Sequence, residues 1–219
     1  MAMKNGIFVT LEGSEGAGKS TQVALLVDRL RAMGRAVLTL REPGGTELGE
    51  EIRRLIRRVD FTIAPCAEAE LLLFLASRAQ LVREKILPAL HEGMLVICDR
   101  YFDSTLAYQG AARSLPLEQI GFINAFAISK CVPHITFLLD LDPAEGLRRV
   151  HLHHGKEADD RMERETITFF EKVRAGYLSL AEREPDRFVI LDAHKSIKAI
   201  HGEIFNFLCH RLGGAIESR

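Results

Sequence analysis

Short apolar runs alternate with longer stretches of helical periodicity along the chain. The runs are rich in β-branched residues and leucine and predict five strands, over residues 6–12, 36–40, 94–98, 134–141 and 188–191. Between them, apolar residues recur every three or four positions, which predicts helices over residues 20–33, 46–59, 67–91, 115–130, 142–152, 163–183 and 197–212. Nearly continuous apolar strands separated by helices predict an α/β fold with a parallel sheet covered on both faces.

Length and composition fit one folded domain over residues 1–219, since a domain typically has about 150 residues. The 29 basic and 30 acidic residues give a net charge of −1, which argues against an extended basic surface that binds nucleic acid or an anionic membrane. No apolar run reaches the roughly 18 residues of a membrane span, and the N-terminus lacks a signal-peptide pattern. Four widely spaced cysteines without a C-x-x-C motif indicate reduced thiols in a cytoplasmic protein.

The first predicted strand is followed by a glycine-rich loop that matches the pattern G-x-x-x-x-G-K-[ST]. Its members are Gly13, Ser14, Glu15, Gly16, Ala17, Gly18, Lys19 and Ser20. Glycines let successive backbone N–H groups surround phosphate oxygens, and the following helix adds the positive end of its dipole. We expect Lys19 to reach the β- and γ-phosphates and the Ser20 hydroxyl to bind Mg²⁺. The alternative, a glycine-rich surface turn, does not explain the strand before the loop and the helix after it.

The loop predicts a nucleoside triphosphate but does not specify its use. The sequence has no N/T-K-x-D motif of the kind that GTPase switches use to read the base. The third predicted strand ends in Cys98-Asp99-Arg100, and not in the Asp-Glu pair typical of motor and transporter ATPases. Asp99 is therefore a candidate Mg²⁺ ligand beside a fixed cation, Arg100.

Polar residues that follow the other strands indicate a pocket for a second anion. Phe74 and Arg78 are four residues apart in a predicted helix and share a face, although core packing is an equal alternative for Phe74. An aromatic ring can stack on a base, and guanidinium groups can hold a phosphate monoester. Hydrogen-bonding groups suited to a base edge follow the third strand, at Ser104, Thr105, Tyr108 and Gln109.

Six stretches of the sequence, in order along nearly the whole chain, resemble thymidylate kinases, which phosphorylate dTMP to dTDP with ATP. They are EGSEGAGKSTQ (12–22), REPGGT (41–46), EEIR (50–53), FLASRAQLV (74–82), DRYFDSTLAYQG (99–110) and LDLDPAEGLRR (139–149). The resemblance implies a P-loop nucleoside monophosphate kinase core with a five-stranded parallel sheet, a small mobile lid, Mg-ATP as the phosphoryl donor and a homodimer.

The resemblance also implies roles for individual residues. Phe74 would stack on thymine, and Arg78, Thr105 and Gln109 would read its edge. Arg53 and Arg100 would hold the dTMP phosphate, with Glu42 nearby. Tyr108 would crowd the ribose 2′ position, and Glu15 would meet the 3′-hydroxyl. ATP would contact the phosphate loop and Thr21, and Arg148 or Arg149 would lie over the adenine. The residues expected to act in catalysis are Lys19, Arg100 and Arg161, the last of which would contact the transferring phosphate.

The lid predicted from the resemblance spans residues 148–161. Gly16 stands where one branch of the family has a basic residue, so the chain resembles the branch whose catalytic arginines lie in the lid. Arg148, Arg149 and Arg161 are present, but His151, His153 and His154 replace other expected arginines. Three interpretations of these histidines remain open: solvated surface residues, cations that replace arginine, or a metal site, for which only His151 and His154 share a helical face.

Two other functions remain possible from the sequence. The first is a kinase for dUMP, dCMP or a deoxynucleoside; a deoxynucleoside kinase would need a carboxylate base at the 5′-hydroxyl and would not need Arg53 and Arg100 together. The second is a nucleotide-binding module without catalysis, which would leave the second pocket without a role.

Overall fold

The computed structural model describes residues 6–154 and 160–212 and contains the predicted parallel sheet. The strands are β1 (Ile7–Glu12), β2 (Val37–Arg41), β3 (Leu95–Asp99), β4 (Ile135–Asp140) and β5 (Phe188–Asp192). They are ordered β2-β3-β1-β4-β5, and every neighbouring pair is parallel. The carboxyl ends of β1, β2 and β3 therefore meet at one edge, where the sequence places its candidate site residues.

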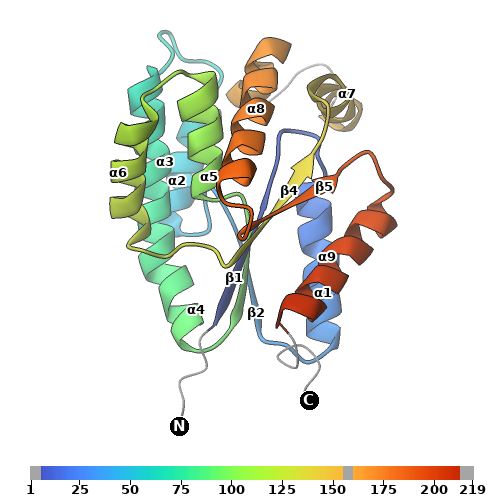
Figure 1. The fold of residues 1–219 in the computed structure, drawn as a ribbon. Coiled ribbons are helices and arrows are strands. Elements are labelled where there is room, and N and C mark those ends of the chain that lie inside the picture. Colours follow the sequence, from blue (N-terminus) through green and yellow to red (C-terminus); the bar gives the residue numbers. More distant parts are fainter. Residues whose placement is uncertain (1–5, 155–159, 213–219) are drawn as a thin grey trace.

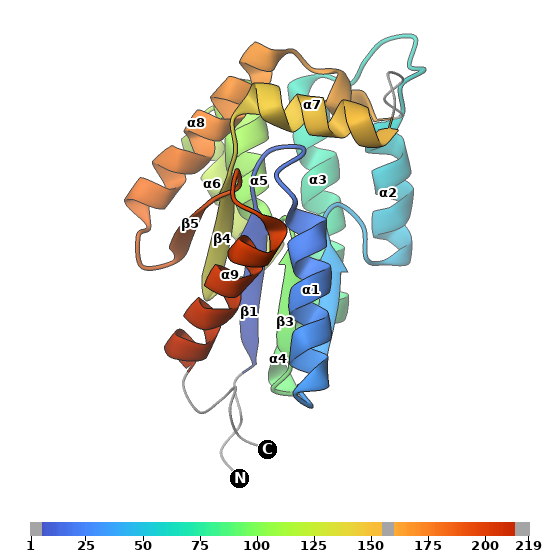
Figure 2. The same cartoon turned by 90° about the vertical axis from the view of Figure 1, so that its right-hand side faces the viewer.

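Helices cover both faces of the sheet (Figure 1). The helices α1 (Lys19–Ala32) and α9 (Ile197–Leu212) lie on one face. The other face carries α3 (Ala67–Leu81), α4 (Leu87–His91), α6 (Leu117–Ile128) and α8 (Ile167–Arg183). The helix α2 (Glu47–Arg57) packs on α3, and α7 (Pro143–His154) crosses the carboxyl edge above the start of α1 (Figure 2).

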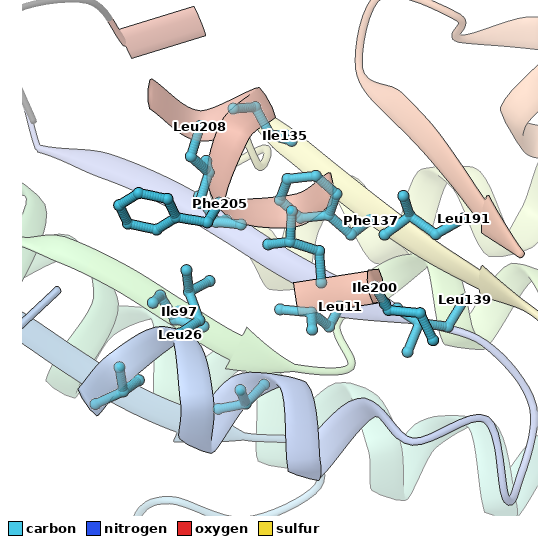
Figure 3. Close-up of a cluster of buried hydrophobic side chains, with 14 of the residues drawn as sticks. Leu11, Leu26, Ile97, Ile135, Phe137, Leu139, Leu191, Ile200, Phe205 and Leu208 are labelled. Carbon is cyan, nitrogen blue, oxygen red and sulfur yellow. The ribbon is translucent and has the colours of Figure 1, made fainter. Parts of the chain in front are cut away.

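Alternating strand residues fill two different cores, as the pleat of a strand requires. Val9 and Leu11 of β1 pack with Phe137 of β4 against α1 and α9 (Figure 3), whereas Phe8 packs on the opposite face against the α3 layer. Both faces of these strands are buried, which explains why their sequences are continuous apolar runs.

The helical segments differ from the prediction at three places. The helix predicted over residues 67–91 is continuous but contains a π-helical segment, η1 (Val82–Ile86), between α3 and α4. The helix predicted over residues 163–183 is divided: a 3₁₀ turn, η3 (Arg161–Arg164), precedes α8, because the Thr166 hydroxyl caps α8 by accepting a hydrogen bond from the Phe169 N–H.

The third difference is a helical segment that the sequence did not predict. The chain after β3 forms α5 (Phe102–Thr105) and the π-helical segment η2 (Leu106–Ala112). Several of its buried positions are polar, namely Asp103, Thr105 and Gln109, so the hydrophobic period that signals a helix is absent. No helix in the described part of the chain is long and apolar enough to cross a membrane.

Candidate active site

The glycine-rich loop turns tightly between β1 and α1 at the carboxyl edge of the sheet. Gly16 and Gly18 have φ angles of 72° and 90°, a left-handed conformation that glycine adopts without strain. A Cβ atom at Gly16 would also clash with the Gly146 carbonyl oxygen of α7, so a side chain has no room there. The loop glycines thus permit both the turn and the close approach of α7.

Lys19 begins α1 and directs its ammonium group over the loop. Its Nζ donates hydrogen bonds to the carbonyl oxygens of Gly13 (3.0 Å) and Ser14 (2.7 Å). Burial and then the neighbouring charge of Arg100 lower the pKa of Lys19 to about 8. A bound polyphosphate would favour the protonated form and offset this destabilisation, which suits a lysine that binds phosphate.

Ser20 and Asp99 meet at the junction of α1 and β3. The Ser20 hydroxyl donates to the Asp99 Oδ2 atom over 2.6 Å. A hydroxyl and a carboxylate are oxygen donors of the kind Mg²⁺ prefers, and Mg²⁺ takes its other ligands from phosphates and water. Across residues 6–154 and 160–212 there is no cluster of three or more His, Cys, Asp or Glu residues that could hold a metal ion. The pair fits Mg²⁺ carried in with a nucleotide better than a metal held by the protein alone.

Arg100, directly after β3, is fixed by hydrogen bonds from several elements. Its Nη1 donates to the Gly13 carbonyl (2.9 Å) and to the Tyr177 hydroxyl (3.2 Å), and its Nη2 donates to Glu15 (2.9 Å). Its φ angle of 67° lies in the left-handed region, which is strained for arginine and is tolerated where the surroundings fix the backbone. The guanidinium is therefore a preorganised cation beside the phosphate loop.

One cavity of about 1350 Å³ joins the phosphate loop to the segments that follow β2 and β3. Most of the residues predicted for the site line it: Glu15, Gly16, Ala17, Gly18, Lys19, Ser20, Thr21, Glu42, Arg53, Phe74, Asp99, Arg100, Thr105, Tyr108 and Gln109. Five do not line it, namely Gly13, Ser14, Arg78, Arg148 and Arg161. The arrangement can accommodate two anionic ligands end to end, with Lys19 and Arg100 between them.

Comparisons with known proteins show the family to which the chain belongs. A family model described as thymidylate kinase matches residues 11–204. The chain belongs to the thymidylate kinase family. It is 49% identical over 209 residues to the thymidylate kinase of Deinococcus radiodurans, covering 95% of this chain and 99% of that protein. For the thymidylate kinase of Halothermothrix orenii the identity is 45%, covering 96% and 98%. A crystal structure of the Ehrlichia chaffeensis thymidylate kinase matches with a TM-score of 0.74 and 32% identity, covering 93% of this chain and 98% of that one.

Within this family member, Arg78 lies behind the cavity wall. Its side chain is 1% exposed and donates to Glu42 (2.8 Å), Thr105 (2.8 Å) and Asn124 (2.9 Å). The resemblance implies that Arg78 reads the base edge; in the structure its guanidinium donates to Thr105, a residue of the cavity wall. Burial raises the pKa of Glu42, and the Arg78 charge opposes that shift.

A buried carboxylate that sequence reasoning missed organises the floor beneath Arg100. Glu12, at the end of β1, accepts hydrogen bonds from the Tyr101 N–H, the Ser104 hydroxyl and the Tyr177 hydroxyl, each over 2.7 Å. Burial, and then the negative charge of Asp103, raises the pKa of Glu12 to about 7. The sequence signal for Glu12 was an acidic residue at the end of an apolar strand. Its partner Tyr177 of α8 is far away in the sequence, so no motif spacing connects the two residues.

Of the lid arginines, one lines the cavity and the other two are paired with carboxylates. Arg148 is exposed and pairs with Glu145, whereas Arg149 lines the cavity and donates to the Ala193 carbonyl over 3.2 Å. Arg161 pairs with the buried Glu70 and donates to the Ile56 carbonyl. His151 is exposed; the side chains of His153 and His154 and the lid residues 155–159 lie outside the described residues, so the three interpretations of the histidines stay open.

Proposed function

We propose that the chain transfers the γ-phosphoryl group of ATP to dTMP and produces dTDP, a step toward dTTP for DNA synthesis. The observation that carries this proposal is the shared cavity. The phosphate loop lines one end, while Phe74 and Thr105 line the other, and Arg100 lies between the two ends. A nucleotide-binding module without catalysis would have no use for the second half of this cavity.

The donor half binds the ATP phosphates. Loop amides and the α1 dipole favour the negative charge, and Lys19 adds a cation at the β- and γ-phosphates. Ser20 and Asp99 would hold Mg²⁺, which neutralises phosphate charge when bound. Arg149 lines the cavity near α9 and contacts the adenosine side in place of the exposed Arg148.

The acceptor half binds dTMP. Phe74 offers a ring for stacking, and Thr105 and Gln109 offer polar atoms to the base edge. Tyr108 lies against the sugar, where its hydroxyl is held by Glu15 over 2.6 Å, and excludes a 2′-hydroxyl. Arg53 and Arg100 bind the monoester phosphate, and Glu42 orders this wall through Arg78.

The reaction is an in-line attack by a dTMP phosphate oxygen on the γ-phosphorus of ATP. A phosphate monoester is largely a dianion near pH 7, so no general base is required. Lys19 and Arg100 stabilise the charge that spreads over the transferred group. Closure of the lid, residues 148–161, excludes water that would otherwise accept the phosphoryl group. Arg161 can contact the transferred group only if its pair with Glu70 opens.

Two further proposals concern the oligomeric state of the enzyme and its location in the cell. Large apolar side chains on neighbouring helices are exposed, with Leu72 of α3 at 59%, Phe122 of α6 at 71% and Phe126 of α6 at 81%, which supports a homodimer that covers them. The free thiols support a cytoplasmic enzyme, and the net charge of −1 supports the absence of a nucleic-acid or membrane partner.

The experiment that tests the function is a product assay with ATP and four acceptors side by side: dTMP, dUMP, dGMP and thymidine. The proposal predicts dTDP as the main product and little product from dGMP or thymidine. Efficient phosphorylation of thymidine would indicate a deoxynucleoside kinase. Tight ATP binding without turnover of any acceptor would indicate a binding module.

A further inference from the structure

Thr105 and Gln109, one helical turn apart, line the acceptor half of the cavity, and each is held by a buried charge outside it. The Arg78 Nη1 atom donates to the Thr105 hydroxyl oxygen over 2.8 Å. Arginine has donors and no acceptor, so the Thr105 oxygen must accept, and its own hydrogen stays available to the cavity. Thr105 thereby becomes a hydrogen-bond donor toward a ligand.

Gln109 has the opposite hydrogen-bonding role to Thr105. Its Nε2 atom donates to the Glu70 Oε1 atom over 2.8 Å. An ionised carboxylate has acceptors and no donor, so it selects the NH₂ end of the amide. Gln109 lines the cavity and Glu70 does not, which leaves the amide oxygen of Gln109 as the atom offered to a ligand. Gln109 thereby becomes an acceptor.

Glu70 is well suited to fix this orientation because it is buried and strongly paired. Its side chain is 1% exposed and also accepts hydrogen bonds from Arg113 and Arg161. Burial alone would raise the pKa of Glu70, but the hydrogen bonds from Arg161 and Gln109 and the charge of Arg113 outweigh burial and lower it. The carboxylate is therefore ionised at neutral pH and cannot donate to Gln109.

We propose that Glu70 is a specificity-determining positioning residue: by holding the Gln109 amide nitrogen, it makes the Thr105–Gln109 pair present a donor beside an acceptor. This inference rests on the proposed function. Thymine and uracil present the complementary edge, an O4 acceptor beside the N3–H donor. Cytosine presents the reverse, an amino donor beside the N3 acceptor, and would leave both protein groups mispaired.

The substitution Glu70→Gln tests this proposal because it keeps the shape and reverses one hydrogen bond. The Nη2 atoms of Arg113 and Arg161 both donate to the Glu70 Oε2 atom, so the amide oxygen of the substituted side chain keeps that place and the new NH₂ group takes the Oε1 place. There it loses only the longer bond from the Arg113 Nε atom (3.3 Å), faces Gln109 and turns that amide around. We expect the ratio of kcat/KM for dTMP over dCMP to fall by about tenfold or more. The ratio for dTMP over dUMP should not change, because both bases have the same edge.

Two further variants keep the test decisive. Arg113→Met removes another partner of Glu70 without touching Gln109, and it should leave the dTMP over dCMP ratio unchanged even if stability falls. Gln109→Met removes the acceptor itself and should lower that ratio while it preserves dTMP over dUMP, so the inference remains testable if Glu70→Gln does not fold.

The outcomes separate the inference from the proposed function. If the unmodified protein prefers dTMP to dCMP and folded Glu70→Gln keeps the same ratio, the role of Glu70 is overturned while the function stands. Equal losses for dCMP, dUMP and dTMP would show a merely structural role and overturn it as well. Failure of the unmodified protein to phosphorylate dTMP would instead overturn the function.

Discussion

Several charged residues around the cavity are buried, and each is paired. Glu12, Glu70 and Arg78 are at most 1% exposed, and a buried charge is tolerated only when hydrogen bonds compensate for lost hydration. The motifs revealed Lys19, Ser20 and Asp99 because their chemistry depends on local spacing. Glu12 and Glu70 could not be identified as site residues, because their partners, such as Tyr177 for Glu12, are far away in the sequence.

Replacing Lys19 by alanine should separate catalysis from acceptor binding. Lys19 lies on the loop, whereas dTMP would contact Phe74 and Arg100, so we expect kcat to fall about a hundredfold or more with little change in dTMP affinity. Steady-state kinetics and calorimetric titration with dTMP measure the two quantities. If the Lys19→Ala variant has the same unfolding temperature as the unmodified protein but loses both kcat and dTMP affinity, this division of roles is contradicted.

Glu12 makes the stability of the fold depend on pH. Its pKa is raised to about 7 in the folded protein, so between pH 4.5 and 7 the folded state binds more protons than the unfolded state and stability falls as pH rises. Glu12→Gln should remove about 3 kcal/mol of that decline. Urea unfolding of the unmodified protein and of Glu12→Gln, at several pH values between 4.5 and 7, measures the free energy of unfolding. If the two proteins lose stability in parallel as pH rises, Glu12 does not titrate in this range.

Elements are most predictable where the buried positions are uniformly apolar. The strands were predicted closely because they are nearly continuous apolar runs, buried on both faces at the centre of the sheet, and α9 because its buried face repeats with a helical period. The α5–η2 segment was missed because Asp103, Tyr108 and Gln109 point polar groups inward for hydrogen bonding. The break before α8 depends on a cap at Thr166, which a continuous helical pattern conceals.

The contact between α7 and the phosphate loop should be sensitive to a single methyl group. A Cβ atom at Gly146 would lie 2.5 Å from the Glu15 carbonyl oxygen, whereas one at Gly121 of α6 would meet no atom within 4 Å. We expect Gly146→Ala to cost about 1–3 kcal/mol and to raise the KM for ATP. The matched control Gly121→Ala should gain about 0.5–1 kcal/mol, since alanine favours a helix.

Thermal unfolding and steady-state kinetics compare these two variants directly. Equal effects of the two alanines on stability and on the KM for ATP would mean that α7 does not need this close approach to the loop.

At the scale of the whole molecule, the parallel sheet brings the ends of β1, β2 and β3 to one edge, and this arrangement creates the cavity. The sequence predicted the parallel sheet and the edge, because these follow from the alternation of strands and helices. It did not predict which charges lie in the cavity and which lie behind it. That distinction, as for Arg78, depends on side-chain packing between helices distant in sequence.

The proposed homodimer predicts a change of mass on removal of the exposed aromatic residues. Replacing Phe122 and Phe126 together by serine should shift the protein from dimer to monomer, because a hydrophobic interface loses its largest side chains. Sedimentation equilibrium measures the mass. The control Ile63→Ser alters an 85% exposed residue outside these helices and should remain dimeric. A monomeric unmodified protein would contradict the proposal.

The most direct test of the account is a crystal structure of the protein with dTMP and a non-hydrolysable ATP analogue bound. The account predicts thymine against Phe74, with its N3–H toward the Gln109 oxygen, and the dTMP phosphate on Arg100 facing the γ-phosphate of the analogue. Density for dTMP away from Phe74, Gln109 and Arg100 would contradict it.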